Sequence, residues 1–97
     1  MPAYIISDVT IRDQEAFQTY RSRAAASIAH YGGRYLVRGG QVETLEGEWH
    51  PTPLIVVEFP DIEQARRWYA SAEYAAALDV RDAALSRHLI LADGMAP

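Results

Sequence analysis

The stretch LIVVEF at residues 54–59 decides the fold. It has no helical spacing, and in an extended backbone its side chains alternate between two sides. Ile55, Val57 and Phe59 then share one face, and the opposite face is also apolar apart from Glu58. A strand with two apolar faces needs a covering layer on both sides of its sheet.

The residues after this strand predict helices and a last strand. Asp61 follows Pro60 and can accept amide hydrogens of a first helical turn, and Gln64 three residues later is typical of a capping box. Ser71 can begin a second helical piece. The last strand is expected over 88–92. In the first helical piece the apolar face comprises Ile62, Ala65, Trp68 and Tyr69. In the second piece the residues that share one side are Tyr74, Leu78, Arg81 and Leu85.

The N-terminal half predicts a strand over 4–11, a helix capped by Asp13, and a second strand over 34–38. Gly32 and Gly33 end the helix, because glycine adopts the left-handed conformation without a steric penalty. In the second strand, Tyr35 and Val37 are expected on one face and Arg38 on the other. Residues 41–45 can form an extended arm, and the expected apolar face of the helix comprises Phe17, Tyr20, Ala24, Ile28 and Tyr31.

The predicted order is β-α-β-β-α-β, an α+β, ferredoxin-like arrangement with a four-stranded antiparallel sheet. Its helices cover one face of the sheet. The other face is expected to carry apolar side chains as well, so we expect a homodimer in which two sheets pack face to face. The residues expected on that second face include Tyr4, Ile6, Leu54 and Val56.

Length and composition restrict the classes to which this protein can belong. The 97 residues predict a single domain over 1–97. Nine basic and thirteen acidic residues give a net charge of −4 without a basic stripe, so we expect no nucleic-acid partner. There is no cysteine, which excludes disulfides and cysteine-ligated metals. We expect no signal peptide, no membrane partner and a cytoplasmic location.

Several short motifs resemble the domain of unknown function 1330 family, in the dimeric α/β-barrel superfamily. They occur in the order YGGRYLVRGG (31–40), LEGEW (45–49), VEFPD (57–61), WY (68–69), SAEY (71–74) and Arg81. The resemblance implies a ferredoxin-like subunit that dimerises through its sheet. It implies little about chemistry, because the superfamily also includes cofactor-free monooxygenases, haem-degrading enzymes and isomerases.

Arg38 and Glu58 are candidate functional residues. The second and third strands are expected to be antiparallel neighbours, with both residues on the dimer side of the sheet. Arg38 could bind a ligand carboxylate while Glu58 acts as a base. Alternatively, the two residues form a cross-strand or interface salt bridge.

A second set of candidates could line a cleft between the helices and the sheet. Tyrosine hydroxyls and an arginine fork suit a small acid there. The alternative is that the aromatic rings are helix core with wet hydroxyl tips and that Arg81 is paired with an acid such as Glu58. The set comprises Tyr20, Arg23, Tyr69, Tyr74 and Arg81.

His50 lies next to Trp49 in a loop and could act as a general acid or base. The three histidines have no metal-ligand spacing, so we expect neither a metal site nor a cofactor. Three hypotheses follow. The first is a domain that binds a small acidic or aromatic ligand through Tyr20, Arg38, Tyr69 and Arg81; the others are a cofactor-independent enzyme, such as an isomerase or monooxygenase, and a purely structural interaction module.

Overall fold

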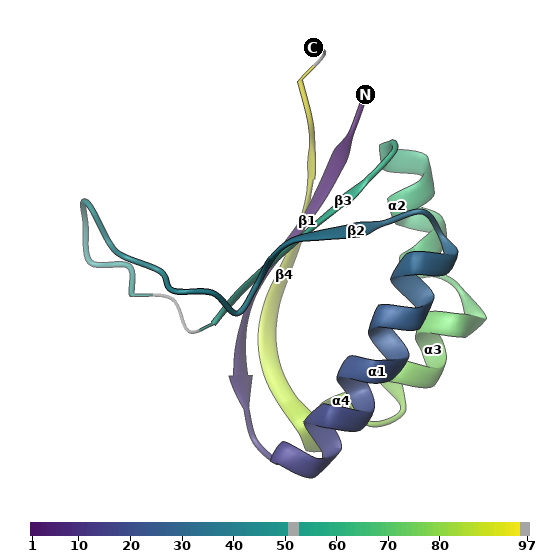
Figure 1. Ribbon diagram of the computed structural model, residues 1–97, viewed down its shortest axis with the longest axis horizontal. Coiled ribbons are helices and arrows are strands. Elements are labelled where there is room, and N and C mark those ends of the chain that lie inside the picture. The colour runs from purple at the N-terminus through teal and green to yellow at the C-terminus, as the bar shows by residue number, and fades with distance from the viewer. Residues whose placement is uncertain (51–52, 96–97) are drawn as a thin grey trace.

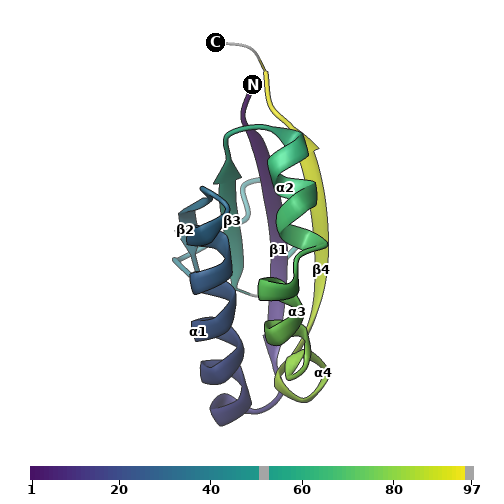
Figure 2. The ribbon, with the colours of Figure 1, turned by 90° about the vertical axis from the view of Figure 1, so that its right-hand side faces the viewer.

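The chain folds into a sheet with helices on one side (Figures 1 and 2). The computed structural model describes residues 1–50 and 53–95. The elements are, in chain order, β1 (Ala3–Ile11), α1 (Gln14–His30), β2 (Arg34–Arg38), β3 (Leu54–Phe59), α2 (Ile62–Tyr69), α3 (Ala72–Leu78), α4 (Arg81–Ala84) and β4 (Leu85–Asp93).

The four strands form one sheet in the order β2-β3-β1-β4, and every neighbouring pair is antiparallel. β1 is central: it pairs with β3 from Ala3↔Phe59 to Asp8↔Leu54 and with β4 along its whole length. This topology confirms the predicted ferredoxin-like fold. Figure 2 shows α1 and the α2–α4 segment side by side over the sheet.

The three predicted helix caps are confirmed. Asp13 accepts a hydrogen bond from the amide of Ala16, and Ser71 accepts one from the amide of Tyr74. The Asp61 carboxylate accepts from the amide of Gln64 at 2.7 Å. The Gln64 side chain, however, donates to the Tyr31 carbonyl at 3.0 Å, so it ties α2 to the end of α1 instead of completing a capping box.

The core lies between the helices and one face of the sheet. Ala3 and Ile5 of β1 and Val57 and Phe59 of β3 are buried there, as the alternation predicts. Aromatic rings pack together where α2 meets β3 and α3. Trp68 packs between Phe59 and Tyr74, with ring centroids 5.4 and 4.2 Å away, and its indole N–H donates to Ser27 at 2.9 Å.

The last strand begins earlier than predicted. Helical spacing placed Leu85 in the preceding helix, but α4 has only four residues and Leu85 is extended, with φ −161° and ψ 166°. Leu85 pairs with Ile11, so the β1–β4 ladder continues to the end of β1. This pairing places Arg87 inside the strand, opposite Val9.

A bulge in β2 corrects the predicted facing of this strand. Tyr35 pairs with Val57, but Val37 pairs with Val56, so one residue of β2 has no partner. The extra residue returns Arg38, opposite Ile55, to the helix-covered face together with Tyr35. The expectation that Arg38 points to the other side of the sheet is therefore wrong.

The face of the sheet without helices is apolar, as expected. We call it the open face. Leu36 of β2 and Ile90 of β4 are 46% and 58% exposed, and the residues between them are half-buried. Residues 39–50, which we call the arm, project away from the layers and contain no strand (Figure 1). Within residues 1–50 and 53–95, no helix is long and apolar enough to cross a membrane.

Candidate functional site

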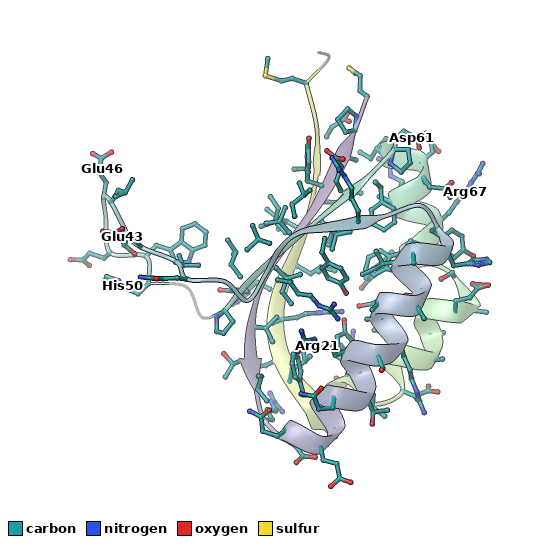
Figure 3. The ribbon with its side chains drawn as sticks, in the orientation of Figure 1. Arg21, Glu43, Glu46, His50, Asp61 and Arg67 are labelled. Carbon is teal, nitrogen blue, oxygen red and sulfur yellow. The ribbon has the colours of Figure 1, made fainter. Side chains whose placement is uncertain are left out.

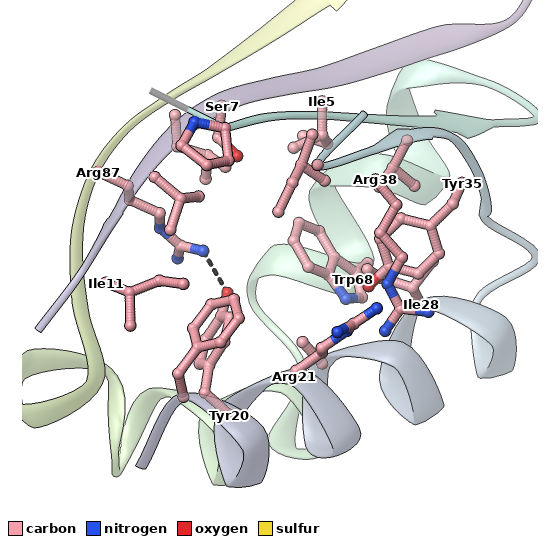
Figure 4. A pocket seen from close by; sticks show the side chains of 18 residues that line it. Ile5, Ser7, Ile11, Tyr20, Arg21, Ile28, Tyr35, Arg38, Trp68 and Arg87 are labelled. Atoms are coloured by element: carbon pink, nitrogen blue, oxygen red, sulfur yellow. Dashed lines mark hydrogen bonds between the residues drawn. The ribbon is translucent and has the colours of Figure 1, made fainter. Parts of the chain in front are cut away.

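A cavity of about 270 Å³ lies between the helix-covered face of the sheet and α1 (Figure 4). All four strands contribute to one wall, while α1 and Trp68 of α2 form the other. The lining is mostly apolar. Its aliphatic and aromatic part comprises Ile5, Val9, Ile11, Phe17, Ala24, Ile28, Tyr35, Ile55, Val57, Trp68 and Leu89.

Three arginines from three different elements also line this cavity: Arg21 of α1, Arg38 at the end of β2, and Arg87 of β4. No Asp, Glu or His belongs to the described lining, and none of the three arginines forms an ion pair with a described residue. The cavity is therefore strongly positive in a chain whose net charge is −4. This charge favours an anion inside it.

Arg21 and Arg38 are exposed and belong to the mouth of the cavity. The Arg38 guanidinium lies over the Tyr35 ring, 4.3 Å from the ring centroid, in a cation–π contact. Burial raises the pKa of the Tyr35 hydroxyl, and the positive charges of Arg38 and Arg21 act in the opposite direction. Tyr35 therefore stays protonated at neutral pH between two cations.

Arg87 belongs to the opposite, deep end of the cavity. Its guanidinium donates hydrogen bonds to the hydroxyls of Tyr20 and Tyr74, and these two hydroxyl oxygens lie 2.8 Å apart. Burial by itself would lower the pKa of Arg87, but the two tyrosines outweigh it and the pKa lies above the usual value. Burial is the largest cause that raises the pKa of Tyr74, and the neighbouring Tyr20 raises it further. The arginine is thus charged, and Tyr74 is neutral.

The structure separates the predicted ligand-binding residues. Tyr20 and Arg38 line the cavity, whereas Tyr69 and Arg81 line a second depression between β4 and the α2–α4 segment, which shares Arg87 and Leu89 with the cavity. Tyr69 is 47% exposed, and the Arg81 Nε atom lies 3.3 Å from the Asp82 carboxylate. Arg81 is therefore paired with its neighbour and not with Glu58.

The two predicted catalytic candidates lie outside the cavity. Glu58 is on the open face, where its carboxylate accepts from Arg34 Nε at 2.8 Å and from the Tyr4 hydroxyl at 3.1 Å. The Arg38–Glu58 pair is therefore wrong: the strand register places Arg34 opposite Glu58, and the bulge further along β2 turns Arg38 to the other face of the sheet. His50 is exposed in the arm, with Nδ1 3.4 Å from the Thr44 hydroxyl.

Arg87 was missed by sequence reasoning, as was the position of Arg21 in the lining. The signal for Arg87 was present, since Leu85, Arg87 and Leu89 alternate onto one face once the strand begins at Leu85. A charged residue between two leucines on a core-facing side indicates either a buried pair or a ligand site. Among the described residues, no three acidic or histidine side chains cluster to hold a metal ion.

The chain belongs to the family described as domain of unknown function DUF1330, whose model matches residues 2–95. Among solved structures, it is similar to a protein of unknown function from Rhodopseudomonas palustris, with a TM-score of 0.77 and 20% identity over 99% of this chain and 84% of that one. No curated protein matches.

Two further solved structures share the fold at lower identity. SnoaB, a cofactor-independent oxygenase from Streptomyces nogalater, has a TM-score of 0.67 and 15% identity over 99% of this chain and 95% of its own. A dimeric protein of unknown function and ferredoxin-like fold from Bacteroides fragilis has a TM-score of 0.55 and 13% identity over 96% of each chain. These likenesses establish the fold of this protein and leave its chemistry to its own residues.

Proposed function

We propose that this protein binds a small organic acid with an aromatic or apolar body in the cavity beneath α1. The observation that carries the proposal is the charge of the lining: Arg21, Arg38 and Arg87 without a described acidic neighbour. Positive charges gathered around one cavity attract an opposite charge, both at the exposed mouth and at the half-buried Arg87. A bound carboxylate supplies that charge, and its apolar body fills the remaining walls.

Arg21 and Arg38 are the proposed carboxylate ligands, because they are exposed at the mouth and retain free donors. A guanidinium presents a planar fork that matches the two oxygens of a carboxylate. Arg87 is less available for this task, since its N–H groups already serve Tyr20 and Tyr74. The volume of about 270 Å³ suits a molecule with a single ring.

A thermal-shift comparison of benzoate with benzamide tests this proposal, because the two molecules have the same shape and differ in charge. At a concentration one hundred times the Kd, a ligand specific for the folded state adds about 2.7 kcal/mol of stability. For a domain of this size, that raises the Tm by roughly 10 °C or more. Benzoate is expected to raise the Tm more than benzamide does; equal shifts, or none for either, contradict the proposal.

Arg38→Gln is the matching variant, and Arg67→Gln is its control. Arg67 is exposed on the outer side of α2, so its substitution changes the net charge by the same amount away from the cavity (Figure 3). A charge-assisted hydrogen bond contributes about 1.5–3 kcal/mol, and exposure of Arg38 places it at the low end. Arg38→Gln is expected to weaken benzoate binding about tenfold, and Arg67→Gln to leave it within twofold.

We also propose that the protein is a homodimer that pairs its open faces. Leu36 and Ile90 expose apolar surface on this face, and contact with a second sheet would remove that surface from water. The arm adds to the same surface, because Trp49 lines a groove there with Leu54 and Ile90. The dimeric Bacteroides fragilis protein has the same fold. Light scattering at micromolar concentration is expected to give twice the mass of one chain, and the mass of a single folded chain contradicts the proposal.

The enzyme hypothesis uses the same cavity. The feature that favours it is the Tyr20 hydroxyl at the deep end, a group able to bind or transfer a proton. Neither Glu58 nor His50 supports it, because one lies on the open face and the other in the arm. An enzyme built on this cavity would therefore depend on Tyr20 and on the arginines.

A further inference from the structure

The hydrogen bonds at the deep end of the cavity determine where one proton points. Arginine only donates, so the Tyr20 and Tyr74 oxygens each accept a hydrogen bond from Arg87. Their separation of 2.8 Å requires that one hydroxyl also donates to the other. The tyrosine that accepts this second bond still has its own proton to place.

The surroundings of the two tyrosines identify which one has the free proton. Tyr74 is fully buried, does not line the cavity, and has no further acceptor among the described residues. If Tyr20 donated to it, the Tyr74 proton would be buried without a partner, which is costly. Tyr74 therefore donates to Tyr20, and the Tyr20 proton is directed into the cavity that Tyr20 lines.

This arrangement lines the deep end of the cavity with hydrogen-bond donors of Tyr20 and Arg87, and we call this end the corner. By this argument the Tyr20 O–H is directed into the cavity. The charged Arg87 guanidinium donates to the same Tyr20 oxygen and also lines the wall (Figure 4). The described lining of this corner supplies no carboxylate or imidazole that could accept a proton. A neutral phenol placed there would direct its own O–H at other donors, whereas its anion would only accept.

We propose that Tyr20 and Arg87 form an oxyanion site that binds the oxygen of a phenol or an enol as its anion. The proposal rests on the proposed function and deepens it: the ligand has an acidic or polar group for Arg21 and Arg38 at the mouth and an ionisable oxygen at the other end. Binding the anion breaks the O–H bond of the ligand, its electron pair stays on the oxygen, and the proton passes to solvent water.

The corner is suited to an anion for two physical reasons. A preorganised donor beside a fixed positive charge stabilises a developing oxygen anion more strongly than water does, because it needs no reorientation. The adjoining walls are apolar, with Val9, Ile11 and Phe17 excluding water that would screen the interaction. An electron-rich phenolate or enolate held in such a site is activated toward electrophiles.

The pKa of bound 4-nitrophenol tests the proposal, because its anion is yellow and its neutral form is not. The nitro oxygens of this probe can accept from Arg21 and Arg38 while its phenolic oxygen occupies the corner. We expect the protein to bind the anion about tenfold more tightly than the neutral form, which lowers the pKa of the bound probe by about one unit. An unchanged pKa of the bound probe overturns the proposal.

Tyr20→Phe and Tyr74→Phe are matched variants, since each removes one hydroxyl from the same buried group. Tyr20→Phe is expected to lose most of the pKa shift of the probe, although it changes no charge. Tyr74→Phe leaves the Tyr20 proton in the cavity and is expected to retain most of the shift. Equal loss in the two variants, with the fold verified by circular dichroism, contradicts the assignment of the donor to Tyr20.

A comparison on the unmodified protein is independent of whether either variant folds. At a pH where free 4-nitrophenol is ionised, we expect it to bind at least tenfold more tightly than 4-nitroanisole, whose oxygen is methylated. Equal affinities overturn the oxyanion site. If benzoate binds while 4-nitrophenol shows no shift, only this inference fails; if neither compound binds, the proposed function fails with it.

Discussion

The two faces of the sheet differ in what covers them more than in their composition. On the helix-covered face, Val57 and Phe59 are 2% and 0% exposed, whereas Leu36 and Ile90 on the open face are 46% and 58% exposed. The same strands supply both faces by simple alternation. The comparison teaches that the helices of this chain cover only one of the two apolar faces of its sheet, and the proposed dimer would cover the other.

The helix-covered face is itself uneven. Under α2, Phe59, Trp68 and Tyr74 pack against one another, while toward the mouth the same layer leaves a cavity bounded by arginines. One end of this layer is therefore closely packed, and the other end contains the cavity. Substitutions at the two ends and on the two faces should separate these roles.

Phe59→Ala should have the largest effect. Phe59 is fully buried and touches the Trp68 ring, so removing its ring leaves a cavity in the packed end of the core. The expected loss is about 3–5 kcal/mol of unfolding free energy. Urea denaturation measures it, with Ile90→Ala as the counterpart on the open face in a dilute, monomeric sample; equal losses would mean that the two faces are not different.

Gly33→Ala should lower the unfolding free energy by less than Phe59→Ala does, by about 1–3 kcal/mol. A Cβ atom at Gly33 would lie 2.7 Å from Ile28 Cγ2 and 2.8 Å from the Phe59 ring, so the packed end would have to move. Gly40→Ala is the control, since a Cβ atom there meets nothing within 4 Å. A Gly33→Ala protein with an unchanged thermal midpoint would show that this end is packed more loosely than described.

Ile90→Glu tests the open face. Solvent surrounds much of this side chain, so the unfolding free energy of one chain should change by less than about 0.5 kcal/mol. A carboxylate buried between two sheets is costly, however, and the dimer should dissociate. Light scattering should report half the mass of the unmodified protein at the same concentration, and an unchanged mass contradicts face-to-face pairing.

The smallest effect concerns Asp8 and His88 on the open face. A hydrogen bond from His88 lowers the pKa of the Asp8 carboxyl below its usual value. A lowered pKa contributes stability above the unfolded-state value near 4, and this contribution disappears as the pH falls through the folded-state pKa. His88→Gln should raise the pKa of Asp8, measured by carbon NMR of the carboxyl group; an unmoved pKa would mean that the bond is absent in solution.

Much of the fold could be predicted because its signals are local. Alternation in 54–59 identified the strand and the residues on each face, and Asp13, Asp61 and Ser71 identified the helix starts. Each depends on neighbours within four residues, so no tertiary information was needed. The apolar open face followed from the same alternation.

The site could be predicted only in part, because a bulge in β2 and the start of β4 determine it. A single unpaired residue in β2 moves Arg38 from one face to the other, and a strand that begins at Leu85 places Arg87 in the cavity wall. Pairing with a distant strand sets both the bulge and the start of β4, and the local alternation of Leu85, Arg87 and Leu89 indicates the face of Arg87 only once that start is known. Tyr20 lines the cavity because the helical period directs it inward, and its role in ligand binding stays a prediction.

The central claim is that the arginine-lined cavity, and not the open face, receives a small organic anion. A titration of the ¹⁵N-labelled protein with benzoate, followed by proton–nitrogen NMR, locates the binding directly. The account predicts concentration-dependent shifts of the Arg21, Arg38 and Arg87 signals, with Arg67 and Ile90 unmoved. Shifts confined to the open face or the arm, or no shifts up to millimolar benzoate, would contradict it.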